Sequence, residues 1–336
     1  PAVQSEIDAV EANIPNTYEY TTLPFAELLK SDLVELIDME QEYMDHVYAN
    51  FDIEGIRKSG IKLAYDAMYG AGMNVVRRLF PEATLLHADY NPSFMGQAPE
   101  PIARNLKPFA ELIKNSDIAC GMATDGDADR IGLFNAKGEF VDSHHIILLL
   151  IRYLVEHKGV KGNVYTSFSC TSKIKNLCDH YGIENHVTKI GFKYICKEMI
   201  ENESLLGGEE SGGIAVSTHI PERDGIWMGL IIWEYMAKTG KSLDELIQEI
   251  YDTVCDTHTH FLLLSHSLCP THTLSITIPS PPLTQTNFST LSRPLAYIPS
   301  PSPHTASAVV QHHVTISNHL SHYPIPPLIL SLRTHT

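Results

Sequence analysis

The run Asp125-Gly126-Asp127-Ala128-Asp129-Arg130 follows a segment, Asp117 to Thr124, that has the pattern of a short buried strand. The run places three carboxylates at alternate positions. Alternate side chains of an extended segment point the same way, so we expect the three acids to converge. Converging carboxylates repel one another unless a cation lies between them, and oxygen-only ligands are those that Mg2+ or Mn2+ prefers. The acids are expected at the carboxyl end of a strand, where open α/β sheets bind ligands, so the run predicts an α/β fold with a metal site.

Other interpretations of the acidic run can be compared on the residues alone. A calcium EF-hand requires glycine at the sixth position and glutamate at the twelfth, and these are Arg130 and Ala136 here, which excludes it. A phosphatase that forms an aspartyl-phosphate would use Asp125 as nucleophile with Asp127 two residues on, and this spacing leaves the phosphatase open. The third interpretation is a Mg2+ site for phosphoryl transfer, with Arg130 stabilising charge on the transferring group, and beside it the phosphatase is a minority alternative. The fourth interpretation is a solvated acidic turn.

Length and composition limit the classes of function. A chain of 336 residues has room for roughly two or three domains. The net charge of −16 argues against binding to nucleic acids or anionic membranes, which require basic patches. The longest apolar run, Ile146 to Ile151, is too short to span a bilayer. Six cysteines without a CxxC pair are interpreted as buried thiols, which favours a reducing, cytoplasmic location.

The periodicity of the chain predicts two consecutive α/β units with mixed sheets covered by helices. A boundary between the units is expected near Asp142, where Ser143 can cap a helix that runs to His157. The other helices are predicted at 25–51, 73–80, 101–115, 172–181, 192–201, 224–238 and 242–254. The strands are predicted at 61–66, 84–88, 117–124, 130–134, 139–141, 163–168 and 186–190.

The composition changes at Cys255. The chain has no glycine after Gly240, no lysine after Lys241 and no acid after Asp256. The remaining 255–336 segment is rich in Ser, Pro, Thr and His, without helical or strand periodicity. We expect it to be an unstructured tail, best explained by a frameshifted coding region, and we assign its histidines no role.

Two further motifs have chemical potential. Gly207-Gly208-Glu209-Glu210-Ser211-Gly212-Gly213 has paired glycines that permit close approach of a ligand, and Glu and Ser can bind sugar hydroxyls. In Lys189-Ile190-Gly191-Phe192-Lys193 a strand end runs into a helix with cations available for a phosphate. The segment His219-Ile220-Pro221-Glu222-Arg223-Asp224-Gly225 precedes a helix, which Asp224 is expected to cap.

These motifs, in this order, resemble the α-D-phosphohexomutase superfamily of phosphoglucomutases and phosphomannomutases. The resemblance rests on 125–130, 191–193, 208–213 and 223–225, and it covers about Phe25 to Val254. Family members have four domains around one active-site cleft. The resemblance implies that 1–24 is a remnant of domain 1 or a linker, that 25–141 is domain 2 with the metal loop, and that 142–254 is domain 3 with the sugar-binding loop.

The resemblance also implies the reaction and the site. The activity would be an intramolecular phosphotransfer that interconverts hexose 1-phosphate and hexose 6-phosphate through a phosphoserine. Mg2+ would be held by Asp125, Asp127 and Asp129. The catalytic cations near the reacting phosphate would be Arg130 and Lys193, and the residues that bind the hexose phosphate would be Glu209, Ser211, Lys193 and Arg223.

The chain departs from the family pattern at several points. It contains no Thr-Ala-Ser-His-Asn-Pro type loop for the phosphoserine, and we expect the first domain to be missing ahead of Pro1. The tail stands where the phosphate-clamping fourth domain should follow Val254. Some members have a histidine where this chain has Gly213, so a general acid/base role cannot be carried over to that position, and His219 is merely a nearby substitute. The chain is therefore expected to be nearly inactive by itself. A phosphatase and a non-catalytic sugar-phosphate binder are the rival functions.

Overall fold

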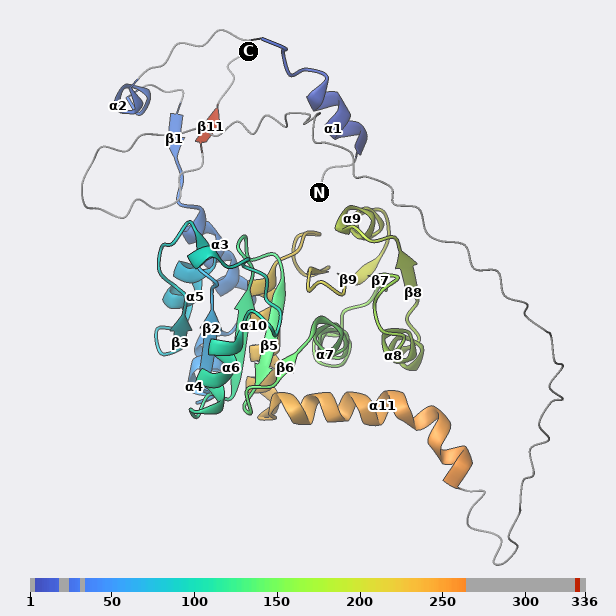
Figure 1. Ribbon diagram of the computed structural model, residues 1–336. Helices are drawn as coiled ribbons and strands as arrows, with labels where there is room; N and C mark the ends of the chain where they lie inside the picture. Colours follow the sequence, from blue (N-terminus) through green and yellow to red (C-terminus); the bar gives the residue numbers. More distant parts are fainter. Residues whose placement is uncertain (1–3, 18–23, 31–33, 264–329, 333–336) are drawn as a thin grey trace, which may run out of the picture. The chain divides into compact units, whose positions relative to one another are not determined.

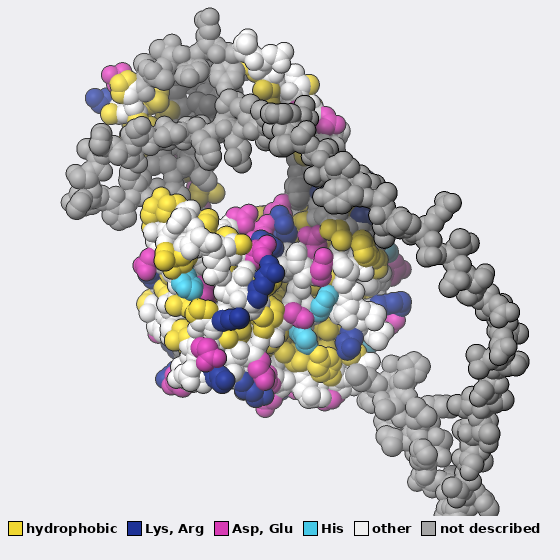
Figure 2. All heavy atoms as spheres, in the orientation of Figure 1, with side chains coloured by type: hydrophobic (Ala, Val, Ile, Leu, Met, Phe, Trp, Pro, Cys, Tyr) yellow, Lys and Arg dark blue, Asp and Glu magenta, His cyan; other side chains and the backbone are white. Residues whose placement is uncertain are grey.

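The computed structural model describes residues 4–17, 24–30, 34–263 and 330–332 (Figure 1). Two mixed sheets covered by helices confirm the predicted α/β class. In the described part of the chain, no helix is long and apolar enough to cross a membrane. Basic and acidic side chains are intermixed on the face that Figure 2 shows, without a large patch of either sign.

The first sheet has five strands in the order β3-β2-β4-β5-β6. Strand β2 is parallel to β3 and β4, whereas β4, β5 and β6 form an antiparallel meander. The strands are β2 (Leu63–Asp66), β3 (Thr84–Leu86), β4 (Cys120–Thr124), β5 (Ile131–Asn135) and β6 (Phe140–Val141). The associated helices are α4 (Ile53–Lys58), α5 (Met73–Leu79) and α6 (Lys107–Lys114), with a 3-10 turn at Phe94–Gly96.

The second sheet has four strands in the order β10-β9-β7-β8, with α9 on one face and α7 and α8 on the other (Figure 1). Its strands are β7 (Asn163–Ser167), β8 (Asn185–Thr188), β9 (Ser204–Gly208) and β10 (Ile214–Val216). Its helices are α7 (Ser143–Glu156), α8 (Lys173–Tyr181), α9 (Phe192–Glu201) and α11 (Leu243–Leu263). The sequence did not predict β10, which is only three residues long and returns antiparallel to β9.

Helix α10 (Gly225–Thr239) joins the two sheets into one hydrophobic core. It is buried continuously from Gly225 to Met236 and packs against β4 and β5 of the first sheet and against α7 and β10 of the second. A helix that is apolar on every side must be covered on every side, which explains this central position. The amino end of α10 therefore lies where the two sheets meet.

The region predicted as one helix over 25–51 is divided. It contains α2 (Phe25–Leu28), β1 (Val34–Leu36) and α3 (Met39–Asn50). Helix α3 starts anew because the side chain of Asp38 accepts the backbone N–H of Gln41, which caps it. Strand β1 pairs with β11 (Leu330–Leu332), which lies in the region predicted to be unstructured. Another helix, α1 (Gln4–Glu11), lies in the predicted remnant of domain 1.

Three helix ends also differ from the prediction. Helix α6 begins at Lys107 instead of Pro101, so Pro108 is the proline of its first turn. The cap of α7 is Asp142, whose side chain accepts the backbone N–H of His145, and not Ser143. Helix α11 continues beyond Val254 to Leu263, and apart from this extension and β11 the tail lies outside the described residues.

Candidate active site

The three acids of the run do converge at the carboxyl end of β4. One oxygen each of Asp125, Asp127 and Asp129 lies within 4.8 Å of the others. The predicted cause of this convergence, an extended segment, was wrong, because the run is a turn. Ala128 is left-handed (φ +61°), and its N–H donates to the carbonyl of Asp125 (3.2 Å). This turn, unfavourable for a residue with a side chain, brings the three carboxylates together.

Two arginines partly neutralise the acids. The Asp125 side chain is only 2 % exposed; it accepts the backbone N–H of Arg130 (3.0 Å) and forms an ion pair with its Nε (2.5 Å). Arg223 Nη2 lies 2.7 Å from Asp129 Oδ2. Burial and the charge of Asp125 nevertheless raise the pKa of Asp129 to about 6. An all-oxygen donor set with an excess of negative charge fits a hard divalent cation such as Mg2+.

The segment after β2 supports the acidic loop through its backbone. The N–H of Ala71 donates to the carbonyl of Gly126 (3.0 Å). A Cβ on Gly70 would lie 2.6 Å from the carbonyl oxygen of Asp125 and 2.8 Å from that of Gly126. Only glycine allows this approach, so the position of the acidic loop depends on Gly70.

The glycine-rich motif forms the turn between β9 and β10. The N–H of Glu209 donates to the carbonyl of Gly213 (3.0 Å), which closes the turn. Glu209 is 6 % exposed, and its Oε1 accepts the backbone N–H of Gly191 at the start of α9 (2.9 Å). Ser211 is exposed at the turn, whereas Glu210 points to the second sheet and accepts the hydroxyl of Ser167 (2.7 Å).

The acidic loop and the glycine-rich turn are bonded to each other. The N–H of Ile131 donates to the carbonyl of Gly212 (3.1 Å), beside an antiparallel bridge between Arg130 and Gly213. Arg223 connects the same two loops, because its side chain passes over Gly213 on the way to Asp129. The structure thus brings together the three acids, both arginines and Glu209.

Two of the predicted residues are less firmly placed. Lys193 is exposed in the first turn of α9, with Nζ 5.3 Å from the centre of the Tyr194 ring. Within the described part of the chain, the ion pairs of the acidic loop are made by Arg130 and Arg223, and none is made by Lys193. The His219 side chain is 4 % exposed and stacks on Trp227 with ring centres 3.9 Å apart. A ring buried in this way is poorly placed to exchange protons with a substrate.

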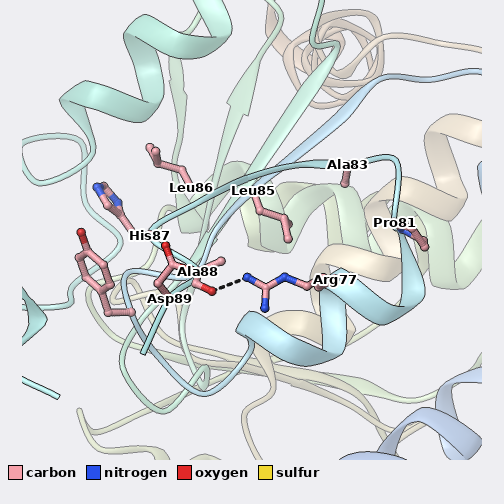
Figure 3. A pocket seen from close by; sticks show the side chains of 9 residues that line it. Arg77, Pro81, Ala83, Leu85, Leu86, His87, Ala88 and Asp89 are labelled. Atoms are coloured by element: carbon pink, nitrogen blue, oxygen red, sulfur yellow. Dashed lines mark hydrogen bonds between the residues drawn. The ribbon is translucent and has the colours of Figure 1, made fainter. Parts of the chain in front are cut away.

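A cavity of about 630 Å³ lies beside the edge strand β3 and was not predicted (Figure 3). Tyr69, Arg77, His87 and Asp89 contribute its polar lining. His87 is also bonded through Nδ1 to the fully buried carboxylate of Asp66 (3.0 Å), and burial raises the pKa of Asp66. The cavity contains none of the site residues that the sequence predicted, so it is separate from the acidic loop.

Fold and site together define an α/β protein in which an acidic, divalent-cation type loop is bonded to a glycine-rich turn that carries a buried glutamate. Comparison with known proteins specifies the family. Residues 41–138 match the model for phosphoglucomutase/phosphomannomutase α/β/α domain II, and residues 142–254 match the model for domain III. The chain therefore belongs to the phosphoglucomutase/phosphomannomutase family, as the resemblance predicted.

Individual relatives agree. The chain is 28 % identical over 228 residues to a phosphoglucomutase/phosphomannomutase of Thermococcus kodakarensis, covering 67 % of this chain and 48 % of the relative. It is 29 % identical over 260 residues to a phosphoglucosamine mutase of Streptococcus sanguinis, covering 74 % and 53 %. A crystal structure of a proposed phosphomannomutase from Thermus thermophilus superposes with a TM-score of 0.65 at 30 % identity, covering 76 % of this chain and 58 % of that one. The chain spans about half the length of the curated relatives it matches.

Proposed function

We propose that this chain provides the metal-binding and sugar-binding loops of a hexose phosphate mutase, an intramolecular phosphotransferase that interconverts hexose 1-phosphates and hexose 6-phosphates. The observation that carries the proposal is the direct junction of the two loops, through the bond from Ile131 to Gly212 and the ion pair of Arg223 with Asp129. Phosphoryl transfer to a sugar requires a metal and sugar-binding groups at one place, and the proposed roles of the two loops would meet this requirement at their junction. Relatives named as phosphoglucomutase and phosphoglucosamine mutase support the reaction class.

In this proposal Asp125, Asp127 and Asp129 hold Mg2+, which would neutralise charge on the transferring phosphoryl group when bound. Arg130 is fixed by its two bonds to Asp125, so its guanidinium is oriented before the substrate arrives. Arg223 is oriented towards the acidic loop by a single ion pair with it, from its Nη2 to Asp129. Cations held in place before the reaction stabilise developing charge without a cost of reorganisation.

The sugar would be bound by the glycine-rich turn. Glu209 is oriented by the N–H of Gly191, and its other oxygen lies beside Gly213, where the absence of a side chain leaves the backbone accessible. Carboxylate oxygens accept bonds from sugar hydroxyls, and the exposed hydroxyl of Ser211 can donate or accept. Lys193, at the start of α9 next to Gly191, has a long, flexible side chain whose ammonium group can reach a bound phosphate.

An aspartyl-phosphate phosphatase is less compatible with the geometry. A nucleophilic carboxylate needs an accessible oxygen in line with the phosphorus. The Asp125 side chain is 2 % exposed and both of its oxygens already accept bonds from Arg130. We expect the 336-residue chain to bind a hexose phosphate but to isomerise it very slowly, because its sequence contains no Thr-Ala-Ser-His-Asn-Pro type loop.

Isothermal titration calorimetry with glucose 1,6-bisphosphate tests the proposal. We expect binding in Mg2+ that disappears in EDTA and in the Asp127→Asn variant. Glu209→Gln should weaken the sugar bisphosphate about tenfold and leave Mn2+ binding unchanged, whereas Glu203→Gln, an exposed glutamate next to β9, should change neither. Binding that is insensitive to EDTA and to Glu209→Gln would contradict the proposal. Release of inorganic phosphate, together with beryllium fluoride trapped on Asp125, would instead identify the phosphatase.

A further inference from the structure

The segment Arg223 to Gly225 contacts the acidic loop at the residue with the least favourable backbone conformation, Ala128. The N–H of Gly225 donates to the carbonyl of Ala128 (2.8 Å), the left-handed residue of the loop. A Cβ on Gly225 would lie 2.6 Å from the carbonyl oxygen of Arg130. The backbones of Gly225 and Arg130 are therefore in direct contact, with no room for a side chain on Gly225. Arg223 adds the ion pair to Asp129. A strained residue persists only where its surroundings hold it, and this segment is what holds Ala128.

Asp224, the middle residue of that segment, is itself held by two side chains. Its Oδ1 caps α10 by accepting the N–H of Trp227 (2.8 Å). Its Oδ2 accepts the hydroxyl of Tyr43 (2.9 Å) and lies 3.1 Å from Nε2 of His219. Tyr43 belongs to α3, 181 residues earlier in the chain. Burial and the Asp224 charge raise the pKa of Tyr43, so its hydroxyl remains a donor.

His219 is fixed on both sides. Its ring stacks on Trp227 at an interplanar angle of 9°, and its Nδ1 lies 3.3 Å from Nε2 of His46 on α3. With 4 % of the side chain exposed, the ring cannot turn towards a ligand without breaking these contacts. Its available function is to hold Asp224.

We propose that Tyr43, His219 and Asp224 form a positioning network that sets the divalent-metal affinity of the acidic loop. The network fixes Asp224, and Asp224 fixes its neighbours Arg223 and Gly225, which contact Asp129 and Ala128. This inference rests on the proposed metal site. The three side chains are positioning residues, since they act on the acids only through the backbone and through Arg223.

Mn2+ titration followed by electron paramagnetic resonance tests the inference. Tyr43→Phe removes one hydroxyl, and we expect the Kd for Mn2+ to rise about tenfold. The matched control is Tyr153→Phe, because Tyr153 also donates from a buried position to a carboxylate of α10, Glu234 (2.7 Å), far along the helix from the acidic loop. Both variants should lose thermal stability, and only Tyr43→Phe should lose metal affinity. His219→Ala should behave like Tyr43→Phe, and His219→Gln, which keeps a donor, should recover part of the affinity.

Equal Mn2+ affinities for Tyr43→Phe, Tyr153→Phe and the unmodified chain would overturn the inference and leave the metal site intact. If the unmodified chain binds Mn2+ no better than Asp127→Asn does, the metal site itself fails, and the inference fails with it. Weaker Mn2+ binding in both tyrosine variants would show a general effect of instability, which also contradicts a specific positioning role.

Discussion

Replacing Gly70 by alanine should displace the acidic loop, because the added methyl group would collide with the backbone of that loop. The added methyl group would lie 2.6 Å from the carbonyl oxygen of Asp125, 2.8 Å from that of Gly126 and 2.9 Å from that of Ala67. All three obstacles are backbone atoms, so no side-chain rotation can relieve the contacts. One of them belongs to a residue whose side chain is a proposed metal ligand.

The size of the displacement follows from ordinary contact distances. Carbon and carbonyl oxygen tolerate a separation of about 3.3 Å, so the Asp125 carbonyl must retreat by about 0.7 Å from the 2.6 Å position. Metal–ligand distances tolerate only about 0.2 Å. We therefore expect Gly70→Ala to weaken Mn2+ binding by more than about tenfold and to lower the free energy of unfolding by about 2 kcal/mol, which is typical of an overpacked core site.

Mn2+ titration and urea unfolding measure the two effects separately. Gly60→Ala is the control, because a Cβ there meets nothing within 4 Å. The positive φ of Gly60 (+75°) should cost about 1 kcal/mol of stability in that variant, without an effect on Mn2+. If Gly70→Ala were destabilised yet bound Mn2+ with unchanged Kd, the reasoning that Gly70 positions the acidic loop would be refuted.

Two further substitutions test the surroundings of the site. Tyr65→Phe removes the hydroxyl that lies 2.6 Å from the fully buried hydroxyl of Thr124. Urea unfolding should therefore show that the free energy of unfolding falls by about 1–2 kcal/mol. An unchanged urea midpoint would contradict this. Asp142→Asn retains a capping side chain but loses the charge paired with His145, which lowers the pKa of Asp142 from 3.8 to about 2. Because the folded state favours the charged carboxylate, its stabilisation is full above pH 3.8 and is lost as the pH falls towards 2. The difference in urea midpoint between Asp142→Asn and the unmodified chain should therefore be larger at pH 5 than at pH 3, and modest at both, because the carboxylate is 46 % exposed.

Local signals in the sequence were sufficient for the acidic loop and its strand. The buried run before the acids predicted their position at the end of β4, and the spacing of the acids predicted that the carboxylates converge, although a turn and not an extended segment brings them together. The hairpin of β5 and β6 was predicted from two short apolar runs around a glycine turn. These features depend on neighbours within a few residues, which is the range over which periodicity and turn chemistry act.

Contacts between distant segments could not be predicted in the same way. Nothing near Tyr43 indicates that its hydroxyl meets Asp224, and the ion pair of Arg223 with Asp129 likewise joins two motifs that look independent. The predicted start of the helix over 25–51 was wrong because a helix end depends on capping as well as on the apolar pattern. The side chain of Asp38 caps α3, so this helix begins at Met39 although the apolar spacing continues upstream. The sequence predicted the helix at 224–238 but neither its continuous burial nor the two sheets that cover it.

The net charge of the acidic loop and its two arginines supports the proposed function. Three carboxylates and the two guanidiniums of Arg130 and Arg223 leave one net negative charge, which repels a phosphate and attracts a cation. A bound divalent ion reverses the sign to one net positive charge, so the same loop then attracts the dianionic phosphate of a sugar. Metal and sugar phosphate should therefore increase each other's affinity by the same factor, as linkage requires. Burial and the Asp125 charge raise the pKa of Asp129 to about 6 in the metal-free loop, so protons should compete with the metal for this carboxylate and weaken metal binding as the pH falls below that value.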